Sequence, residues 1–546
     1  MVTPPADITI DAVGLFTPVS LGTATAYDVL DGTLIPSSDG VDYYRPGSHQ
    51  ITWRATDAAG NTGSAIQTVN VIPLVSFAKD QTTTEGTGVR VRVILNGSAV
   101  SYPVTVPYVL AGSAAVDGSD HDLTDGVATI SSGLETQLEF TTLDDGPGEG
   151  AEQIVITMET PTNAVMGAHS IHTIQLLEGN VPPRVDLSAD QGMGMTHTVV
   201  SEAGPVVISS QVTDPNLGDQ HSYDWSATDS ALSDLDTVGD RYTFDPSILT
   251  PGLYTLRLTV SDGSASDTSE LSLNVIAAAP DLSSTQDSDG DGTDDASEGF
   301  GDSDNDGVAD YLDAIASANV LQEQRGMNDN YLIEGEPSLR LQLGRIALQR
   351  DDGGAHVGID EIQSFGGFDG DSQYDYPGGL FDFVIEEVPV IGQSVQIVLP
   401  QLEAIPSNAI YRKAQSGGWR DFVVDEANSL ASAPGSQGYC PPPGDIGYIE
   451  GLNEGHWCVQ LTLEEGGPND ADGLANNAIE DPGGVASRVS STDNSSSSKG
   501  GGGGGIDLLL LWLLLSTMAF RTRTSKQNGF IPGRRCLLSS KPAHHK

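Results

Sequence analysis

The sequence predicts a mainly β protein: a string of β-sandwich modules, an acidic linker, a further β-rich domain and a C-terminal hydrophobic helix. The chain has 64 glycines and only 18% charged residues, which is typical of β-rich modules joined by tight turns. Short runs of alternating apolar and polar residues are bounded by Gly, Ser and Asn, as in half-buried strands. A length of 546 residues exceeds one hydrophobic core and predicts three to five domains.

Charge and cysteine content exclude several classes of function. The formal net charge of −52 argues against nucleic acid and anionic membrane surfaces as partners. It favours an extracellular setting, where divalent cations are abundant. Three cysteines in so long a chain exclude a disulfide-rich scaffold.

Residues 1–73 predict the first sandwich. Residues 49–71 hold two alternating runs around an Asp-Ala-Ala-Gly-Asn turn, which is a hairpin pattern, and Trp53 is expected to fill the core. The motifs ATAYD, PGSHQITWRATDAAGN and TVNV resemble an HYR domain, an immunoglobulin-like module. No basic segment followed by an apolar one comes after Met1, so we expect no signal peptide in this chain. We expect the chain to start inside or just before its first strand, as a truncated sequence would.

Residues 74–180 predict a second sandwich, with alternating runs at 75–77, 89–95 and 104–109. The motifs VSFA, Glu85-Gly86, SDHDL, LDDG, GEGAE and EGN resemble a Calx-beta domain. That resemblance implies a calcium site at one end of the sandwich, held by Glu85, Asp120, Asp144, Asp145, Glu149 and Glu152. The family's late acidic run is reduced here to Glu-Gly-Asn at 178–180, so solvated loop carboxylates stay open as the alternative.

Residues 181–276 begin with a Val-Pro-Pro linker and predict a third sandwich. A Trp-containing run at 223–225 and a final hairpin at 253–275 resemble a PKD or cadherin-like module. The resemblance is to a general type and implies no binding residue.

The acidic stretch 287–313, within a predicted linker at 281–315, repeats one pattern after fifteen residues. Its side chains fall at positions 1, 3, 5, 9 and 12 of a twelve-residue calcium loop, with Gly at position 6. The first loop uses Asp287, Asp289, Asp291, Asp295 and Glu298, and the second Asp302, Asp304, Asp306, Asp310 and Asp313. Thr293 and Val308 at position 7 are expected to offer backbone carbonyls. The sequence therefore predicts Ca²⁺ as the cofactor.

Eleven carboxylates and no Lys or Arg lie between residues 287 and 313, so without a cation the segment repels itself. No helix is expected before Asp287, and the pair resembles thrombospondin type 3 repeats or dockerin loops. Asp313 replaces the usual Glu at position 12 and reaches one methylene less far, which predicts a second site that is either weaker or completed by water. An acidic disordered linker is the alternative, but it requires neither the glycines nor the repeated phase.

Residues 316–487 predict the further β-rich domain. The motifs GWRDFVVDEAN, YCPPPGDIGYIEGLNEGHWCVQLTLEEGGPNDADG and AIEDPGGVA resemble the choice-of-anchor U domain. The resemblance implies proximity to a cell-envelope sorting signal and no chemistry. Cys440 and Cys458 are expected to form a disulfide, since this module is placed outside the cytoplasm, and free buried thiols are the alternative.

The C-terminal end combines a Ser/Gly linker at 488–505, an apolar helix at 506–520 and a basic tail at 521–546. Fifteen helical residues span about 22 Å, short of the roughly 30 Å hydrocarbon core. The order resembles the GlyGly-CTERM sorting signal of Gram-negative bacteria. This implies removal of the helix by a rhombosortase-type protease, type II secretion, and a location at the outer surface or in the medium. Membrane contact is expected only through this helix.

No motif for a nucleophilic serine, a zinc protease or a phosphate loop is present, so we expect no enzymatic activity from this chain. Two functions fit the pattern. One is a calcium-stiffened surface or secreted stalk that binds an unknown protein or glycan. The other is the non-catalytic end of a secreted hydrolase whose catalytic domain lies upstream.

Overall fold

Strand formation follows the alternation of apolar and polar residues. In β12 (Gly88–Leu95) Val89, Val91 and Val93 are buried while the intervening arginines face outward. This burial places one face of each strand in a core and drives the pairing of sheets. The computed structural model describes residues 1–114, 120–144, 150–192, 194–324, 330–350, 353–366, 370–415 and 417–489. All of these belong to the unit Met1–Val489.

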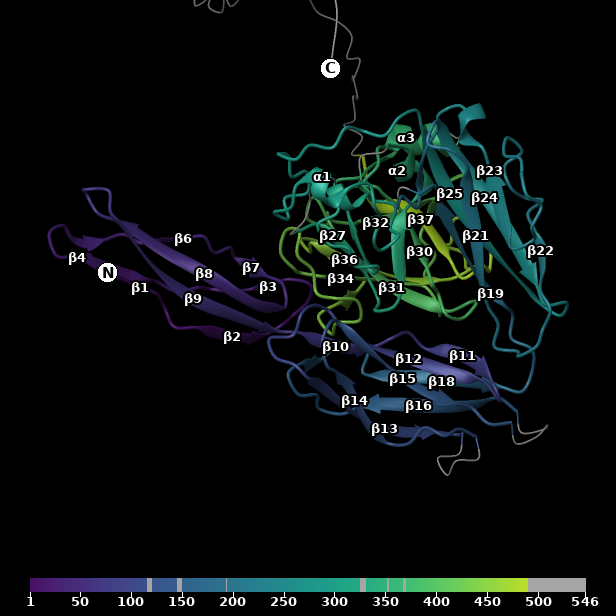
Figure 1. Cartoon of the computed structure of the whole chain (residues 1–546), viewed down its shortest axis with the longest axis horizontal. Helices are drawn as coiled ribbons and strands as arrows, with labels where there is room; N and C mark the ends of the chain where they lie inside the picture. Colours follow the sequence, from purple (N-terminus) through teal and green to yellow (C-terminus); the bar gives the residue numbers. More distant parts are fainter. Residues whose placement is uncertain are drawn as a thin grey trace, which may run out of the picture. The chain divides into compact units, whose positions relative to one another are not determined.

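The N-terminal region forms three small sheets, ordered β1-β4-β5, β2-β9-β8-β6 and β3-β7. Its strands are β1 (Val2–Thr3), β2 (Ile8–Asp11), β3 (Thr17–Pro18), β4 (Thr25–Asp28), β5 (Gly32–Leu34), β6 (Ser37–Ser38), β7 (Tyr43–Tyr44), β8 (Gly47–Thr56) and β9 (Thr62–Ile72). The long hairpin of β8 and β9 turns at 57–61, as expected (Figure 1). Trp53 is buried in this core, and its Nε1 donates to Gln67 Oε1 at 3.0 Å.

The next sandwich pairs a four-stranded sheet, β15-β12-β10-β17, with a five-stranded one, β11-β18-β16-β13-β14. Besides β12, its strands are β10 (Leu74–Phe77), β11 (Gln81–Thr84), β13 (Val104–Gly112), β14 (Gly126–Ile130), β15 (Glu135–Thr141), β16 (Glu152–Met158), β17 (Val165–Met166) and β18 (Ile171–Leu177). Valines, isoleucines and Phe77 fill the space between the sheets.

The third sandwich has sheets β19-β21-β23 and β20-β25-β24-β22. Its elements are β19 (Arg184–Asp190), β20 (Thr198–Val200), β21 (Val206–Thr213), β22 (Ser222–Asp224), β23 (Arg241–Phe244), the 3-10 turn η1 (Pro246–Ile248), β24 (Gly252–Ser261) and β25 (Ser266–Ile276). The final hairpin predicted at 253–275 is the pair β24 and β25. Trp225 lies just after β22 and packs against Tyr242.

The acidic stretch contains the one-turn helix α1 (Asp295–Glu298) and the 3-10 turn η2 (Asp310–Leu312). Two further sheets follow, ordered β26-β27-β31-β36-β34-β35 and β28-β30-β37-β32-β33, with β29 also paired to β37. The elements are β26 (Val320–Gln322), β27 (Leu332–Gly335), β28 (Arg340–Leu343), α2 (Arg345–Arg350), α3 (Ile359–Gly366), β29 (Tyr374–Asp375), β30 (Phe381–Glu386), β31 (Ser394–Pro400), β32 (Ile410–Gln415), β33 (Gly418–Asp421), β34 (Ser429–Ala433), β35 (Ile449–Glu450), β36 (Cys458–Glu464) and β37 (Ile479–Arg488).

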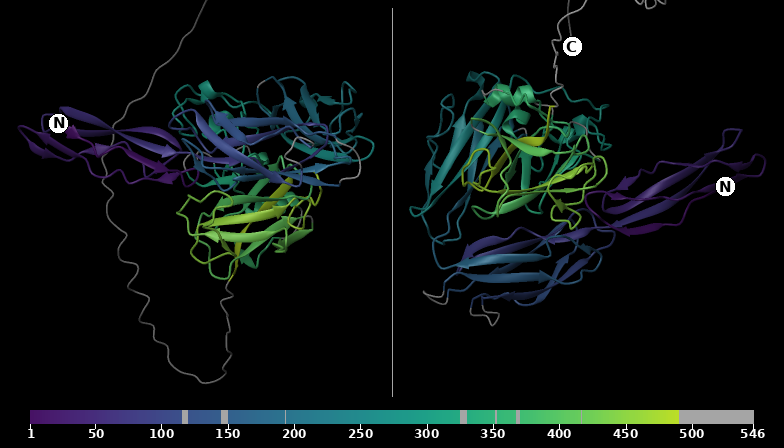
Figure 2. Two further views of the ribbon diagram at one scale, coloured as in Figure 1. Left: turned by 90° about the horizontal axis from the view of Figure 1, so that it is seen from below. Right: turned by 180° about the vertical axis from the view of Figure 1, so that it is seen from behind.

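The expectation of a mainly β fold is confirmed. Strands make up nearly all of the regular structure in the described residues, and the helices are few and short (Figures 1 and 2). Every hydrogen-bonded sheet also lies within one of the predicted ranges 1–73, 74–180, 181–276 and 316–487, or ends one residue beyond the last. The family assignments of these ranges stay predictions.

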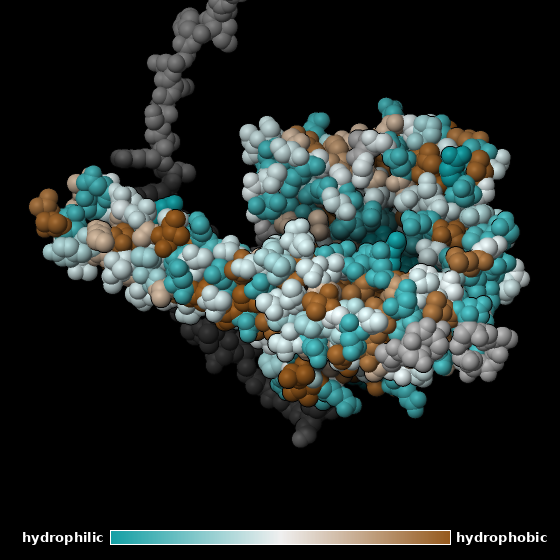
Figure 3. Space-filling model, turned by 60° about the horizontal axis from the view of Figure 1, so that its bottom comes forward, coloured by the Kyte–Doolittle hydropathy of each residue, from teal (hydrophilic) through white to brown (hydrophobic). Residues whose placement is uncertain are grey.

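The described surface is of mixed polarity. On the face shown in Figure 3, hydrophobic side chains lie singly or in small groups among hydrophilic ones, as on most soluble domains. Among the described residues no helix is long and apolar enough to cross a bilayer. The predicted sorting helix at 506–520, the tail at 521–546 and all but the first two residues of the linker lie outside the described residues.

Candidate metal centre

The two acidic loops fold back on themselves where the pattern requires it. Gly292 and Gly307, at position 6, have φ of 101° and 87°, a region that glycine adopts without strain. At position 4, Gly290 (φ 81°) and Asn305 (φ 62°) are also left-handed, and Asn is among the few other residue types that tolerate this. The left-handed backbone at positions 4 and 6 therefore explains why both loops have Gly at position 6 and Gly or Asn at position 4.

The first loop gathers the carboxylates of positions 1, 3 and 5. Ligand oxygens of Asp287, Asp289 and Asp291 all lie within 4.8 Å of one another. Asp287 accepts from the Gly290 and Gly292 amides at 2.7 and 3.1 Å, and Asp291 accepts from the Thr293 amide at 2.6 Å. These backbone bonds hold the side chains on the inside of the turn.

The second loop repeats the arrangement with Asp302, Asp304 and Asp306, whose oxygens also lie within 4.8 Å of one another. Asp302 accepts from the amides of Asp306 and Gly307 at 3.1 Å each and from the Thr196 hydroxyl. Asp306 accepts from the Val308 amide at 2.7 Å. Position 5 therefore binds the position 7 amide in both loops, and coordination by the position 7 carbonyls stays a prediction.

The position 9 carboxylates do not join these groups of three. Asp295 accepts from the amide and hydroxyl of Ser288 at 2.8 and 3.0 Å, and Asp310 accepts from the same two groups of Ser303 at the same distances. Each therefore ties the end of its loop to position 2. This geometry disfavours direct coordination of the ion by Asp295 and Asp310. Position 9 in such loops often coordinates the ion through a water molecule instead.

Several carboxylate oxygens in the loops are buried without a hydrogen-bond partner among the described residues. They are Asp289 Oδ2, Glu298 Oε2 and both side-chain oxygens of Asp304. An unpaired buried carboxylate costs several kcal/mol or more unless a cation or a proton compensates it. Because Ca²⁺ takes six to eight oxygens, unsatisfied carboxylate oxygens from positions 3 and 12 of one turn match its needs. The residues present therefore fit calcium.

In both loops, charge repulsion between the carboxylate at position 12 and those at other positions contributes to raised pKa values. Burial, together with the neighbouring charges of Asp289, Asp291 and Asp287, raises the pKa of Glu298 to about 7. In the second loop, burial and the charges of Asp313 and Asp302 raise the pKa of Asp304 to about 8. Burial also raises the pKa of Asp313 to about 6. These directions describe the metal-free protein, in which like charges crowd one cavity.

We expect the stability of the metal-free protein to fall as pH rises from about 4 to about 8. Over that range the folded carboxyls of Glu298 and Asp304 keep protons that the unfolded chain has released, since unfolded carboxyls titrate near pH 4. Thermal unfolding of calcium-free protein at several pH values measures this. Glu298→Gln with Asp304→Asn should reduce the dependence, although other buried carboxyls such as Glu334 also contribute to it, and an unchanged profile in that variant would contradict the role of the loops.

The second loop is also part of the C-terminal core. Val308 and Leu312 are 1% and 3% exposed and pack with the apolar residues of the domain that follows. The Leu343 amide of β28 donates to the Asp306 carbonyl at 2.8 Å. The sequence predicts a linker here, whereas the structure shows that the second loop is continuous with the packing of the next domain.

The predicted Calx-beta site is only partly within the described residues, because Asp145 and Glu149 lie outside them. Glu85 follows β11 and Glu152 begins β16, and both strands pair with the same end of β18. The Asp120 carbonyl accepts from the Leu143 amide at 2.8 Å, beside Asp144. The described candidates therefore gather at one end of the sandwich, and calcium binding there stays a prediction.

Sequence reasoning missed two other acidic groups, Asp28 with Asp31 and Asp57, and Asp214 with Asp219 and Asp262. In the first, all three carboxylates accept from backbone amides. In the second, His221 lies 2.8 Å from Asp214. None of their oxygens is buried and unpaired, in contrast to the acidic loops. Each group joins two neighbouring aspartates of one turn to a third from a turn distant in the sequence, so no local pattern predicts either group.

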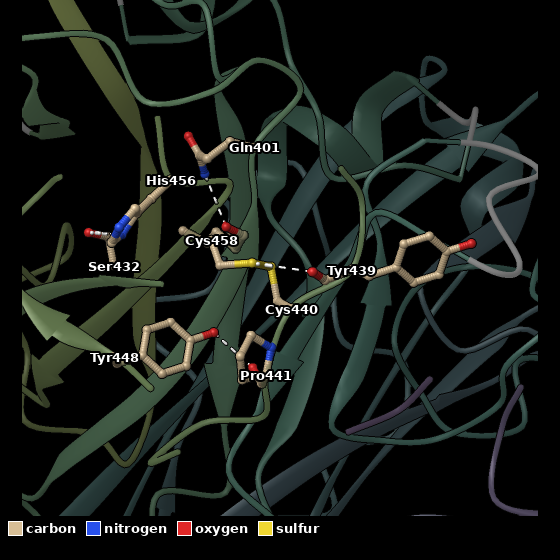
Figure 4. The surroundings of a disulfide bond; sticks show 9 residues. Gln401, Ser432, Tyr439, Cys440, Pro441, Tyr448, His456 and Cys458 are labelled. Carbon is tan, nitrogen blue, oxygen red and sulfur yellow. Dashed lines mark hydrogen bonds between the residues drawn. A yellow bond between two sulfur atoms is a disulfide. The ribbon is translucent and has the colours of Figure 1, made fainter. Parts of the chain in front are cut away.

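The structure joins Cys440 and Cys458 in a disulfide with a Cα–Cα distance of 5.6 Å (Figure 4). Cys458 is fully buried at the start of β36, which pairs with β31 on one side and β34 on the other. The hydroxyl of Tyr448 donates to the Pro441 carbonyl at 2.8 Å, next to the bridge. The bond therefore ties an irregular loop to the centre of a sheet. Cys536 lies outside the described residues.

No protein-family model matches the chain, and the comparison with curated proteins gives no match. Among solved structures, the apo form of a Calx CBD1 domain is 22% identical, covering 19% of this chain and 96% of that one, with a TM-score of 0.18. The ectodomain of mouse nectin-like molecule 4, with three Ig domains, is 13% identical over 51% of this chain and all of that one, with a TM-score of 0.16. An endo-fucoidan hydrolase of glycoside hydrolase family 107 is 13% identical over 48% of this chain and 39% of that one, with a TM-score of 0.14. At identities and TM-scores this low, none of these similarities supports a function for this chain.

Proposed function

We propose that this is a calcium-stabilised modular protein of the cell surface or the secreted fraction, whose β-sandwich modules form an adhesion or interaction stalk. The observation that carries the proposal is the pair of acidic loops, with buried carboxylate oxygens that no described group satisfies. Loops of this kind in extracellular modules bind calcium at about 10⁻⁴–10⁻³ M, so they fill outside a cell and empty in a cytoplasm. Calcium is thus a structural ion here.

Isothermal titration of the metal-free protein with Ca²⁺ tests the structural-ion part. We expect binding in the millimolar range or tighter, and weaker binding of Mg²⁺, which demands stricter octahedral geometry. Asp289→Ala should remove the first site and Asp304→Ala the second. Binding that is unchanged in the double variant would contradict assignment of the ion to these loops.

The surface part of the proposal has its own test. An external protease or an antibody applied to intact cells of the native host should reach the β-sandwich modules, or the protein should be found in the medium. Recovery of the protein from the cytoplasm alone would contradict the surface location but would not contradict calcium binding by the loops. The ligand, a protein or a glycan, is then sought with the calcium-loaded protein.

We also predict that the mature protein ends within or just after the glycines at 500–505, because the following apolar and basic segments resemble a removable sorting signal. Loss of the tail from Ile506 removes seven basic residues and one acidic residue, so the formal charge changes from −52 to −58. The intact mass of protein purified from the native host measures this. Surface protein that retains Arg521 to Lys546 would contradict removal of the tail.

A further inference from the structure

A lysine and an aspartate outside the acidic loops are buried together inside the C-terminal domain. Lys413 of β32 is 1% exposed and Asp481 of β37 is fully buried. Lys413 Nζ and Asp481 Oδ1 lie 2.7 Å apart. Although they are this close, neither the amine nor either carboxyl oxygen is in hydrogen-bonding geometry with any described group. For an ion pair this is unusual, because a buried pair is favourable only when further hydrogen bonds satisfy its members.

The strand register places both side chains on the core side of their sheet. Lys413 lies opposite Gly483 in the β32–β37 ladder, and Asp481 lies opposite Phe383 in the β30–β37 ladder. Residues two apart on a strand share a face, so Lys413, Asp481 and Phe383 all point to the same side. Phe383 and Tyr411 are almost fully buried in the apolar core of this domain, so that face of the sheet is lined by core side chains.

Gly483 provides the space that brings the two groups together. Its φ is not in the left-handed region, so the space around this position, and not its backbone conformation, requires a glycine. A Cβ there would lie 2.7 Å from the Arg412 carbonyl oxygen, 2.9 Å from the Tyr411 ring and 3.1 Å from Asp481 Oδ1. The missing side chain leaves room for the Lys413 stem to reach Asp481 diagonally across the ladder.

From this geometry we propose that Lys413 and Asp481 form an intramolecular amide bond between β32 and β37. In the reaction the neutral Lys413 amine attacks Cγ of the protonated Asp481 carboxyl. A C–N bond forms, a C–O bond breaks, and the hydroxyl leaves with one amine hydrogen as water. No oxidant, reductant or co-reactant is required.

The surroundings favour the neutral forms that this reaction needs. Transfer of one proton within a Lys–Asp pair gives an amine and a carboxylic acid, and an apolar medium disfavours the charged alternative. Burial raises the pKa of Asp481, while the neighbouring lysine acts in the opposite direction. Burial, together with the charge of Asp481, raises the pKa of Tyr411, so its hydroxyl stays protonated in the same core.

The full chain, denatured and reduced, should weigh less than its sequence by the mass of one water molecule. Trypsin should cut after Arg412, Arg420 and Arg488 but not after Lys413. The resulting branched peptide joins 413–420 to 421–488; because its mass equals that of the uncut linear peptide 413–488, sequencing must find two N-termini, Lys413 and Asp421, to place the bond. A water lost elsewhere, for instance as a succinimide, would leave these two peptides separate and would overturn the proposal.

Three variants serve as controls. Lys413→Arg and Asp481→Ala should each show the full mass expected for its sequence. Lys79→Arg alters another lysine–carboxylate pair, in which Lys79 Nζ donates to Glu336 at 2.9 Å, and it should keep the mass deficit. If a core variant fails to fold, the wild-type mass and peptide map still decide. Wild-type protein of full mass, cut after Lys413, would show an ordinary buried ion pair.

Discussion

Removal of calcium is expected to open residues 287–313 to protease and to lower the stability of the C-terminal domain. Without the ion, eleven carboxylates repel one another within this stretch. The second loop also carries Val308 and Leu312 into the core of that domain, so its loss uncovers apolar surface beyond the loop. At about 10 mM calcium, dissociation constants of about 10⁻⁴–10⁻³ M stabilise the folded state by about 1–3 kcal/mol per site.

Limited proteolysis and thermal unfolding, each with calcium and with chelator, measure these effects. Wild-type protein should be cut between Asp287 and Asp313 only in chelator, and Asp289→Ala with Asp304→Ala should be cut in both conditions. Asp219→Ala is the matched control, since it alters an acidic group without unpaired buried oxygens. If chelator changes neither the cleavage nor the radius of gyration, these loops are not held by calcium.

Loss of the Cys440–Cys458 disulfide is expected to destabilise the C-terminal domain by roughly 3 kcal/mol, the chain-entropy value for a loop of this length. The bond joins residues 18 apart and anchors a loop to a buried strand, so its removal frees the unfolded chain and loosens the sheet. Denaturant unfolding of Cys440→Ala with Cys458→Ala, followed by a spectroscopic signal from this domain, measures the effect.

Two comparisons make the disulfide result specific. Reduction of wild-type protein should reproduce the variant, and Cys536→Ser should leave the unfolding transition unchanged. Peptide mapping without reductant should recover the bridged pair. Detection of both Cys440 and Cys458 as free thiols would contradict the pairing and would weaken the extracellular assignment, because disulfides persist mainly in oxidising compartments.

The local sequence pattern predicted those features of the acidic loops that depend only on residues close together in the chain. The fifteen-residue repeat predicted positions 1, 3 and 5 of both loops, which the structure brings together, because alternation in a tight turn sends every second side chain inward. It did not reveal that Asp295 and Asp310 bind Ser288 and Ser303, although a serine stands at position 2 of both loops. These hydrogen bonds depend on the closed conformation of the loop, which places the position 9 carboxylate against the amide and hydroxyl of position 2.

By itself the sequence determined the β class, the hairpins, the acidic loops and the pairing of two cysteines, because periodicity, turn residues and composition act over short distances. Only the tertiary structure decided that Val308 and Leu312 belong to the C-terminal core, since any apolar side chain in a loop has many possible partners. It alone also brought together Lys413 and Asp481, which are far apart in the chain. Their meeting depends on which strands pair and in which register, and long-range pairing of this kind leaves no local trace in a single sequence.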